Sequence, residues 1–194
     1  MNLPNTLAGS RIFLTFVIMA LLFAPYAAAK AVALALFFVA AATDWLDGFL
    51  ARRLRQTTPL GALLDPIADK VLVIGLLLTF VQLRLVAAWM VLVIILRELL
   101  ITGVRLYAVS RGIVIPAARE GKHKTLSQML TLTIVLGLLA VRAFLSGDAA
   151  VAFEMRMIVI IHWCMWLTVV LTVYSGGIFF WRNRALFVET SHGK

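Results

Sequence analysis

The sequence has little of what soluble and secreted folds depend on. Cysteine occurs once, at Cys164, which excludes an internal disulfide framework and a cysteine-based metal site. Charged residues make up 14% of the 194 residues, and only nine residues are acidic. No proline- or serine-rich linker and no internal repeat divides the chain. We therefore expect one membrane domain over residues 1–182, followed by a flexible tail at residues 183–194.

What the chain does contain is apolar sequence. Hydrophobic residues make up 63% of the chain and the mean hydropathy is +1.02. Six apolar stretches each reach about 20 residues, the length that crosses a bilayer as a helix. They are residues 8–29, 31–52, 59–82, 85–109, 124–145 and 154–181. The two-residue alternation of a membrane barrel is missing. The sequence predicts an all-α, polytopic membrane protein with six transmembrane helices, in which short loops make successive helices antiparallel neighbours.

The basic residues predict the orientation of these helices. The net charge is +9, and the basic residues gather mainly in the second loop, the fourth loop and the C-terminal tail. Few of them lie at the opposite helix ends, where Lys30, Arg84, Arg142 and Arg156 occur. Because positive charge stays on the cytoplasmic side, we expect both termini in the cytoplasm. The first apolar stretch lacks a strongly basic leader, so we expect it to remain as a helix and not to be a cleaved signal peptide.

The acidic residues are concentrated in one place. Four of the nine fall within a single apolar stretch of 26 residues, at Asp44, Asp47, Asp65 and Asp69. A carboxylate among membrane-spanning residues is expensive, so it is a functional candidate by default. Four such carboxylates cannot all be ionised without cations nearby. Hard divalent ions with oxygen ligands, such as Mg²⁺ or Mn²⁺, are the simplest solution, and they predict a polar, metal-binding cavity open to the cytoplasm.

The spacing of the four aspartates predicts that they face one another. Thr58 and Pro59 are typical of a helix N-terminus, which centres the preceding turn near residue 56. In an antiparallel hairpin, residues equally distant from the turn lie at equal depth. Asp44 and Asp69 are 12 and 13 residues from position 56, and Asp47 and Asp65 are nine residues from it. The four carboxylates therefore form two levels. The small residues Gly48, Ala51 and Gly61 leave room for a ligand beside them.

The pattern of these residues resembles a known family. Asp44-x2-Asp47-Gly48-x2-Ala51-Arg52-x8-Gly61-x3-Asp65-x3-Asp69 is similar to the signature of the CDP-alcohol phosphatidyltransferases. The resemblance implies a six-helix enzyme of the bacterial cytoplasmic membrane, with homodimers expected. It would bind two divalent ions, join the phosphatidyl group of a CDP-linked lipid to an alcohol, and release CMP.

The resemblance also implies roles for individual residues. Asp44, Asp47 and Asp65 would be the main metal ligands, and Asp69 would be both a ligand and the base that deprotonates the acceptor hydroxyl. The nucleotide side would be lined by Asn5, Asp44, Gly48, Ala51, Arg52 and Gly61. Many relatives have a threonine three residues after the position of Asn5, where this chain has Ala8.

A second set of residues concerns the acceptor. Arg97-Glu98 and Arg105 lie in the fourth apolar stretch, and Lys122, Lys124 and Gln128 follow in and after the next loop. With the start Asn2-Leu-Pro-Asn5, they resemble the pattern of phosphatidylglycerophosphate synthases within the family. The resemblance implies an anionic acceptor, glycerol 3-phosphate, held by Arg97, Arg105, Lys122 and Lys124.

Other interpretations of the sequence stay open. The same chemistry could use serine, inositol phosphate or phosphatidylglycerol as acceptor, and Lys122 and Lys124 could be ordinary cytoplasmic loop charges. A divalent-cation transporter is a further alternative, in which the aspartates form the conduit. That alternative lacks a second acidic cluster, because Asp148 and Glu154 are the only acids expected on the far side.

Overall fold

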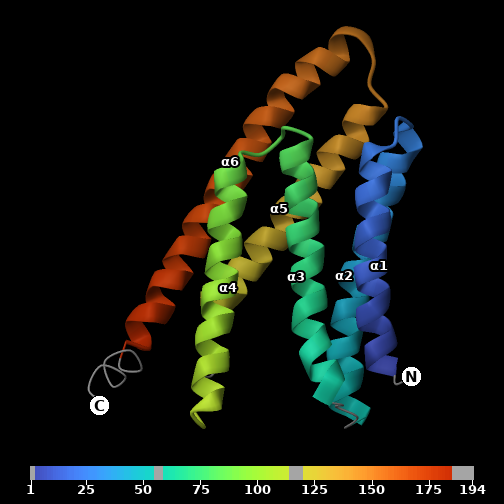
Figure 1. The fold of residues 1–194 in the computed structure, drawn as a ribbon. Coiled ribbons are helices and arrows are strands. Elements are labelled where there is room, and N and C mark those ends of the chain that lie inside the picture. The colour runs from blue at the N-terminus through green and yellow to red at the C-terminus, as the bar shows by residue number, and fades with distance from the viewer. Residues whose placement is uncertain (1–2, 55–58, 114–119, 185–194) are drawn as a thin grey trace.

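In the computed structural model, the described part of the chain consists of helices joined by short turns. The backbone is described for residues 3–54, 59–113 and 120–184, and side chains for residues 9–43, 68, 70–113 and 124–184. Within these ranges there are six helices and no strand (Figure 1). They are α1 (Leu3–Phe23), α2 (Ala27–Leu54), α3 (Pro59–Gln82), α4 (Ala88–Ser110), α5 (Glu120–Ala143) and α6 (Gly147–Arg182). The prediction of an all-α chain is confirmed.

The ends of the helices follow from local chemistry. Pro59 begins α3, as predicted, because a proline at the first helical position loses no hydrogen bond. The first helix ends at Phe23, earlier than the expected residue 29, because Pro25 disfavours a helical conformation at Ala24. Gly112 follows the end of α4, and its φ of 74° is left-handed and suits glycine. The amide of Ile113 then donates to the carbonyl of Ala108 at 2.9 Å.

The helices are not simply packed in chain order. In the described residues, α1 packs against both α2 and α3, α5 packs against α6 and α2, and α4 packs mainly against α6. The α3–α4 contact is smaller, although a short turn joins these helices. Figure 1 shows the reason: α6 runs obliquely across α4, so α4 leans toward α6 instead of lying flat on α3. Among the described residues, successive helices contact each other most at α1–α2 and α5–α6.

The core is apolar, and much of the outer surface is apolar too. The buried core joins residues from all six helices, among them Ile18, Phe37, Leu76, Ile94, Leu136 and Ile161. Large apolar side chains are exposed along α4 and α6, including Leu96, Leu99, Leu106, Trp163, Leu167 and Val170. Exposed apolar faces of this extent indicate contact with lipid. By length and apolarity, two helices within the described residues could cross a membrane, spanning Lys124–Ala143 and Gly147–Arg182.

Candidate active site

The four aspartates lie on the two helices that flank the 55–58 segment. Asp44 and Asp47 belong to the last part of α2, and Asp65 and Asp69 belong to the first part of α3. The helix bounds agree with the turn near residue 56 on which the predicted depths depend. The facing of the carboxylates stays a prediction, because their side chains lie outside the described residues. The same is true of Asn5, Gly48, Ala51, Arg52, Gly61 and Lys122.

Directly after Asp69, Lys70 links α3 to α4. Its ammonium group donates a hydrogen bond to the hydroxyl of Thr102 on α4. The Thr102 hydroxyl in turn donates to the backbone carbonyl of Glu98 at 2.8 Å. Because Lys70 directly follows Asp69, this link joins the aspartate-bearing part of α3 to the charged part of α4.

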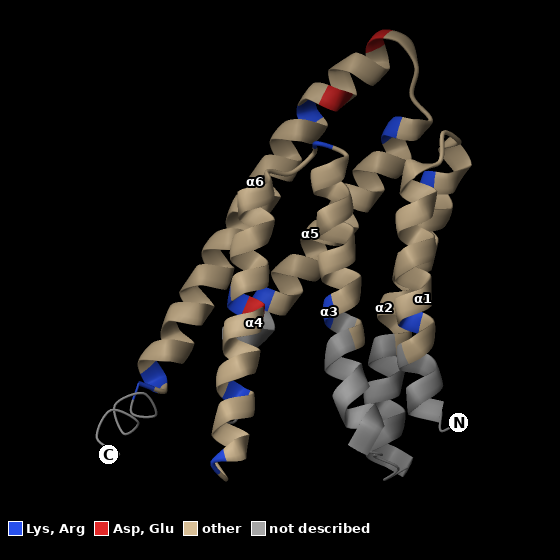
Figure 2. Cartoon of the chain, in the orientation of Figure 1, with Lys and Arg blue, Asp and Glu red and all other residues tan. Residues whose placement is uncertain are grey.

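Glu98 is the centre of a buried charged cluster. Its Oε1 accepts hydrogen bonds from the ammonium group of Lys124 on α5 and from Nη1 of Arg97, the latter at 2.9 Å. The exposed fractions of the Lys124, Arg97 and Glu98 side chains are 6%, 14% and 15%. Figure 2 shows basic and acidic positions close together beside the α4 label, partway along the bundle. Lys124 is thus a buried, paired residue of α5 and not a solvated loop charge.

The other side of Arg97 is held by α6. Its Nη2 donates to the hydroxyl of Ser175 at 3.1 Å, and that hydroxyl donates to the carbonyl of Thr172 at 3.1 Å. Gly176 makes room for the arginine, because a Cβ at this position would be 3.2 Å from Cγ of Arg97. Two of the three guanidinium nitrogens of Arg97 are therefore committed to Glu98 and Ser175. We refer to Arg97, Glu98, Lys124 and Ser175 as the charged cluster.

Arg105 lies two turns further along α4 and is exposed. Its Cζ atom lies 5.8 Å from the centre of the Phe179 ring on α6, within the range of a cation–π contact. Arg97 and Arg105 both contact α6, so they lie on one face of α4. Arg105 differs from Arg97 because its guanidinium stacks on a ring and is not buried in an ion pair.

Sequence reasoning missed several polar residues of the interior. Arg11, in the middle of α1, is only 1% exposed. Its burial could have been predicted, because an isolated arginine in an apolar stretch is a signal of a functional or structural role. Thr102, Ser175 and Gly176 are ordinary residues of membrane helices, and only the packing of α3, α4 and α6 shows that they contact charged groups.

The sequence matches a known protein family over most of its length. The family model described as CDP-alcohol phosphatidyltransferase matches residues 1–174. The chain belongs to the CDP-alcohol phosphatidyltransferase family. The match extends from α1 into α6, so it includes both the aspartate-bearing helices and the partners of Glu98. Within the described residues, no three His, Cys, Asp or Glu side chains gather to hold a metal ion. The side chains of the four aspartates of the signature lie outside that part of the chain, so the metal site stays a prediction.

Curated relatives of this phosphatidyltransferase share one name. The chain is 37% identical to a Bacillus subtilis (strain 168) protein, over 94% of this chain and 95% of the relative. It is 42% identical to a Pseudomonas fluorescens protein, over 70% and 72% of the two chains. It is 36% identical to a Haemophilus influenzae protein, over 68% and 73%. Each is named CDP-diacylglycerol–glycerol-3-phosphate 3-phosphatidyltransferase.

Proposed function

We propose that this phosphatidyltransferase transfers the phosphatidyl group of CDP-diacylglycerol to glycerol 3-phosphate, which yields phosphatidylglycerophosphate and CMP. The relatives that match most of the chain are named for this reaction. The observation in the structure that supports an anionic acceptor is the charged cluster. It places two cations, the half-buried Arg97 and the buried Lys124, around one anion, Glu98.

The charge of the cluster suits a phosphate group. Arg97 and Lys124 both pair with Glu98, and the exposed guanidinium of Arg105 adds a further positive charge on the same face of α4. Cations gathered in this way, each with several N–H donors, suit the acceptor oxygens of a phosphate. We assign Lys124 and Arg105 to direct contact with the acceptor phosphate, together with Lys122. Arg97 orients Lys124 through Glu98 and adds positive charge.

The donor set on α2 and α3 fits divalent cations. Asp44, Asp47, Asp65 and Asp69 offer only carboxylate oxygens, which Mg²⁺ and Mn²⁺ prefer. Lys70, the basic residue beside Asp69, donates to Thr102 on α4. We propose that the four aspartates hold two divalent ions, which when bound would polarise the diphosphate and stabilise charge on the attacking and leaving oxygens. Asn5, Gly48, Ala51, Arg52 and Gly61 would line the nucleotide side.

Different residues bind the acceptor and accept its proton during the transfer. Lys124 and Arg105 hold the acceptor phosphate, so that a hydroxyl of the glycerol lies at the diphosphate. Asp69 accepts the proton of that hydroxyl as its oxygen bonds to the phosphorus that carries diacylglycerol. The bond from this phosphorus to the bridging oxygen breaks, and CMP leaves with the bond's electron pair.

We propose that the protein crosses the bacterial cytoplasmic membrane six times as a single domain over residues 1–182. Both termini would be cytoplasmic, with residues 183–194 as a flexible tail, and the protein would form a homodimer. Two helices in the described residues are long and apolar enough to cross a membrane, and α1, α2 and α3 each carry a shorter apolar segment there. In α4, Arg97, Glu98 and Arg105 interrupt the apolar sequence, and a membrane-embedded acceptor site accounts for them.

The test is CMP release by the purified protein in lipid–detergent micelles. CDP-diacylglycerol is supplied with radiolabelled glycerol 3-phosphate, serine, inositol phosphate or phosphatidylglycerol, with Mg²⁺, with Mn²⁺ and after exhaustive chelation. We expect CMP release and a new labelled lipid product only with glycerol 3-phosphate and a divalent ion. Asp69→Asn should abolish turnover under the same conditions.

Each arm has an outcome that contradicts part of the proposal. Activity that survives chelation would refute the two-metal site. A labelled product from serine or inositol phosphate, but not from glycerol 3-phosphate, would refute the acceptor. Near-normal turnover by Asp69→Asn would remove Asp69 as the base. Metal flux through vesicles without CMP release would favour the transporter.

A further inference from the structure

The interface between α5 and α6 carries a row of buried polar side chains. At one level the hydroxyl groups of Thr131 on α5 and Thr168 on α6 are hydrogen-bonded at 2.8 Å. Nearer the cytoplasmic end of these helices lies the charged cluster, where Lys124 of α5 and Ser175 of α6 meet residues of α4. Gln128 and Thr172 lie between these two levels, each one helical turn from its neighbours in the row.

This intermediate level contains polar atoms that no protein group satisfies. Nε2 of Gln128 and Oγ1 of Thr172 are buried and have no hydrogen-bond partner in the described structure. The exposed fractions of the two residues are 4% and 0%. Nε of Arg97 is a third buried atom without a partner. A buried polar group without a partner costs about 1–3 kcal/mol, so such groups are rare unless something else binds them.

The three atoms come from three helices that converge here. Arg97 of α4 contacts Ser175 and Gly176, and Thr172 lies one turn before them on α6. The Thr131–Thr168 bond sets the register of α5 against α6, and in antiparallel helices it places Gln128 and Thr172 at the same level. Arg97 and Gln128 offer N–H donors, and Thr172 offers a hydroxyl. The group that they would satisfy is therefore an oxygen.

We propose that Gln128 and Thr172, with Nε of Arg97, form a subsite that binds the non-reacting hydroxyl of the acceptor. This inference rests on the proposed function, because it takes glycerol 3-phosphate as the acceptor. The phosphate contacts the cations, and the subsite lies about one helical turn, or roughly 5.4 Å, from Lys124 along α5. A three-carbon alcohol phosphate bridges such a distance. One hydroxyl of the acceptor reacts at the diphosphate, which leaves its central hydroxyl for the subsite.

The consequence is selection by a single hydroxyl. A site built to hydrogen-bond a substrate hydroxyl discriminates against an analogue that lacks it, because buried polar groups are then left without partners. The matching analogue is 3-hydroxypropyl phosphate, which keeps the phosphate and a terminal hydroxyl but lacks the central one. The wild-type protein should prefer glycerol 3-phosphate in kcat/KM by about tenfold or more.

The experiment compares three variants with these two acceptors. Thr172→Val and Gln128→Leu each remove hydrogen-bonding atoms of the subsite at nearly constant volume, and both should bring the preference close to one. Thr168→Val is the matched control, because it removes a buried hydroxyl one turn away that is already paired with Thr131. This control should keep the wild-type preference.

Thermal stability without acceptor provides an independent measurement. Thr168→Val should lower the unfolding midpoint, because it removes a hydrogen bond and leaves Thr131 with a poorer set of partners. Thr172→Val should leave the midpoint unchanged or raise it, because it removes an unpaired hydroxyl. The expected result is that Thr168→Val lowers the unfolding midpoint but keeps the acceptor preference, whereas Thr172→Val keeps or raises the midpoint but loses the preference. Thr172→Val keeps the test valid if Gln128→Leu does not fold.

Two results would overturn the inference, and they are distinguishable from failure of the proposed function. If wild type does not discriminate between the acceptors, or if Thr172→Val keeps the discrimination, the atoms bind water or nothing and the subsite is refuted. In both cases the wild-type protein still makes a lipid product from glycerol 3-phosphate. If it makes none, the proposed function itself has failed and the subsite fails with it.

Discussion

The two arginines of α4 show how the same residue type takes different roles on one helix face. Arg97 is 14% exposed and is held by Glu98 and Ser175, whereas Arg105 is exposed and stacks on Phe179. Loss of Arg97 would leave Glu98 with Lys124 as its remaining partner among the described residues and would remove the donor to the Ser175 hydroxyl, so its effects on folding and function would be mixed. Arg105 is exposed and has no ion pair among the described residues, so its removal disturbs the bundle less than removal of Arg97.

We predict that Arg105→Ala raises the KM for glycerol 3-phosphate by about ten- to a hundredfold, with little change for CDP-diacylglycerol. The loss of a charge-assisted hydrogen bond to phosphate is the physical reason. Arg105→Lys should recover only part, because an ammonium group does not reproduce the planar fork of a guanidinium. Steady-state kinetics with each substrate varied separately provides the measurement.

A control for Arg105 lies on the same helix. Arg111 is also exposed and also stacks on an aromatic ring, with its Cζ atom 5.4 Å from the centre of the Tyr107 ring. Arg111→Ala removes an equal charge at the end of α4 and should leave both KM values near their wild-type values. If Arg105→Ala affects both substrates equally, Arg105 supports the nucleotide or the fold and not the acceptor.

At the scale of helices, the contact between α1 and α3 depends on one glycine. A Cβ at Gly75 would lie 2.9 Å from Cγ2 of Thr15 and 3.2 Å from Sδ of Met19. The methionine can move, but the threonine is fixed because its hydroxyl donates to the carbonyl of Arg11 at 2.9 Å. Small residues of this kind let membrane helices approach closely.

Gly75→Ala should therefore destabilise the protein by about 1–3 kcal/mol, the usual cost of overpacking a tight contact. The measurement is the free energy of unfolding by denaturant in detergent micelles. Gly137→Ala on α5 is the control, because a Cβ there meets no atom within 4 Å and alanine favours a helix. A Gly75→Ala variant as stable as Gly137→Ala would show that α1 and α3 have room to separate.

The sequence predicted the helices better than their partners. The starts and ends follow from apolar length and from prolines, so the expected stretch 59–82 coincides with α3. The family signature on α2 and α3 is equally local, because its members lie within 26 residues. The charged cluster could not be predicted in the same way. Arg97 and Ser175 are 78 residues apart in the chain, and their contact depends on the inclination of α6 across α4.

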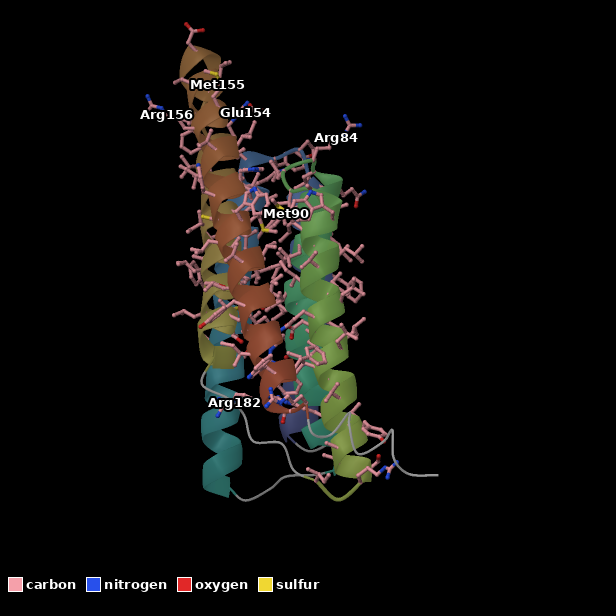
Figure 3. The ribbon with its side chains drawn as sticks, turned by 90° about the vertical axis from the view of Figure 1, so that its left-hand side faces the viewer. Arg84, Met90, Glu154, Met155, Arg156 and Arg182 are labelled. Atoms are coloured by element: carbon pink, nitrogen blue, oxygen red, sulfur yellow. The ribbon has the colours of Figure 1, made fainter. Side chains whose placement is uncertain are left out.

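The orientation of the whole molecule in the membrane can be tested. Figure 3 shows Arg84, Glu154 and Arg156 at one end of the bundle and Arg182 toward the other. We predict that the α5–α6 turn faces the outside and the end of α4 faces the cytoplasm. In a Cys164→Ser background, Ser146→Cys should react with a membrane-impermeant maleimide in cells with a permeabilised outer barrier and an intact inner membrane.

The matched variant for this measurement is Ser110→Cys. Both serines are exposed and both lie at a helix end, so they differ mainly in the side of the membrane on which they lie. Ser110→Cys should react only after the inner membrane is lysed. Labelling of Ser110→Cys in intact membranes, with protection of Ser146→Cys, would show that the orientation is reversed.

The length of α6 links the site to bilayer thickness. Its 36 residues would extend about 54 Å, whereas the hydrocarbon layer is about 30 Å thick. A helix longer than the layer accommodates by tilting or by thickening the bilayer around it, and α6 is visibly inclined to α3 and α4 (Figure 1). Ser175 and Gly176 belong to this inclined helix and contact Arg97. A thinner membrane would increase the inclination and shift these two residues against α4. We therefore expect the lipid composition of the membrane, through its thickness, to influence how the charged cluster is held together.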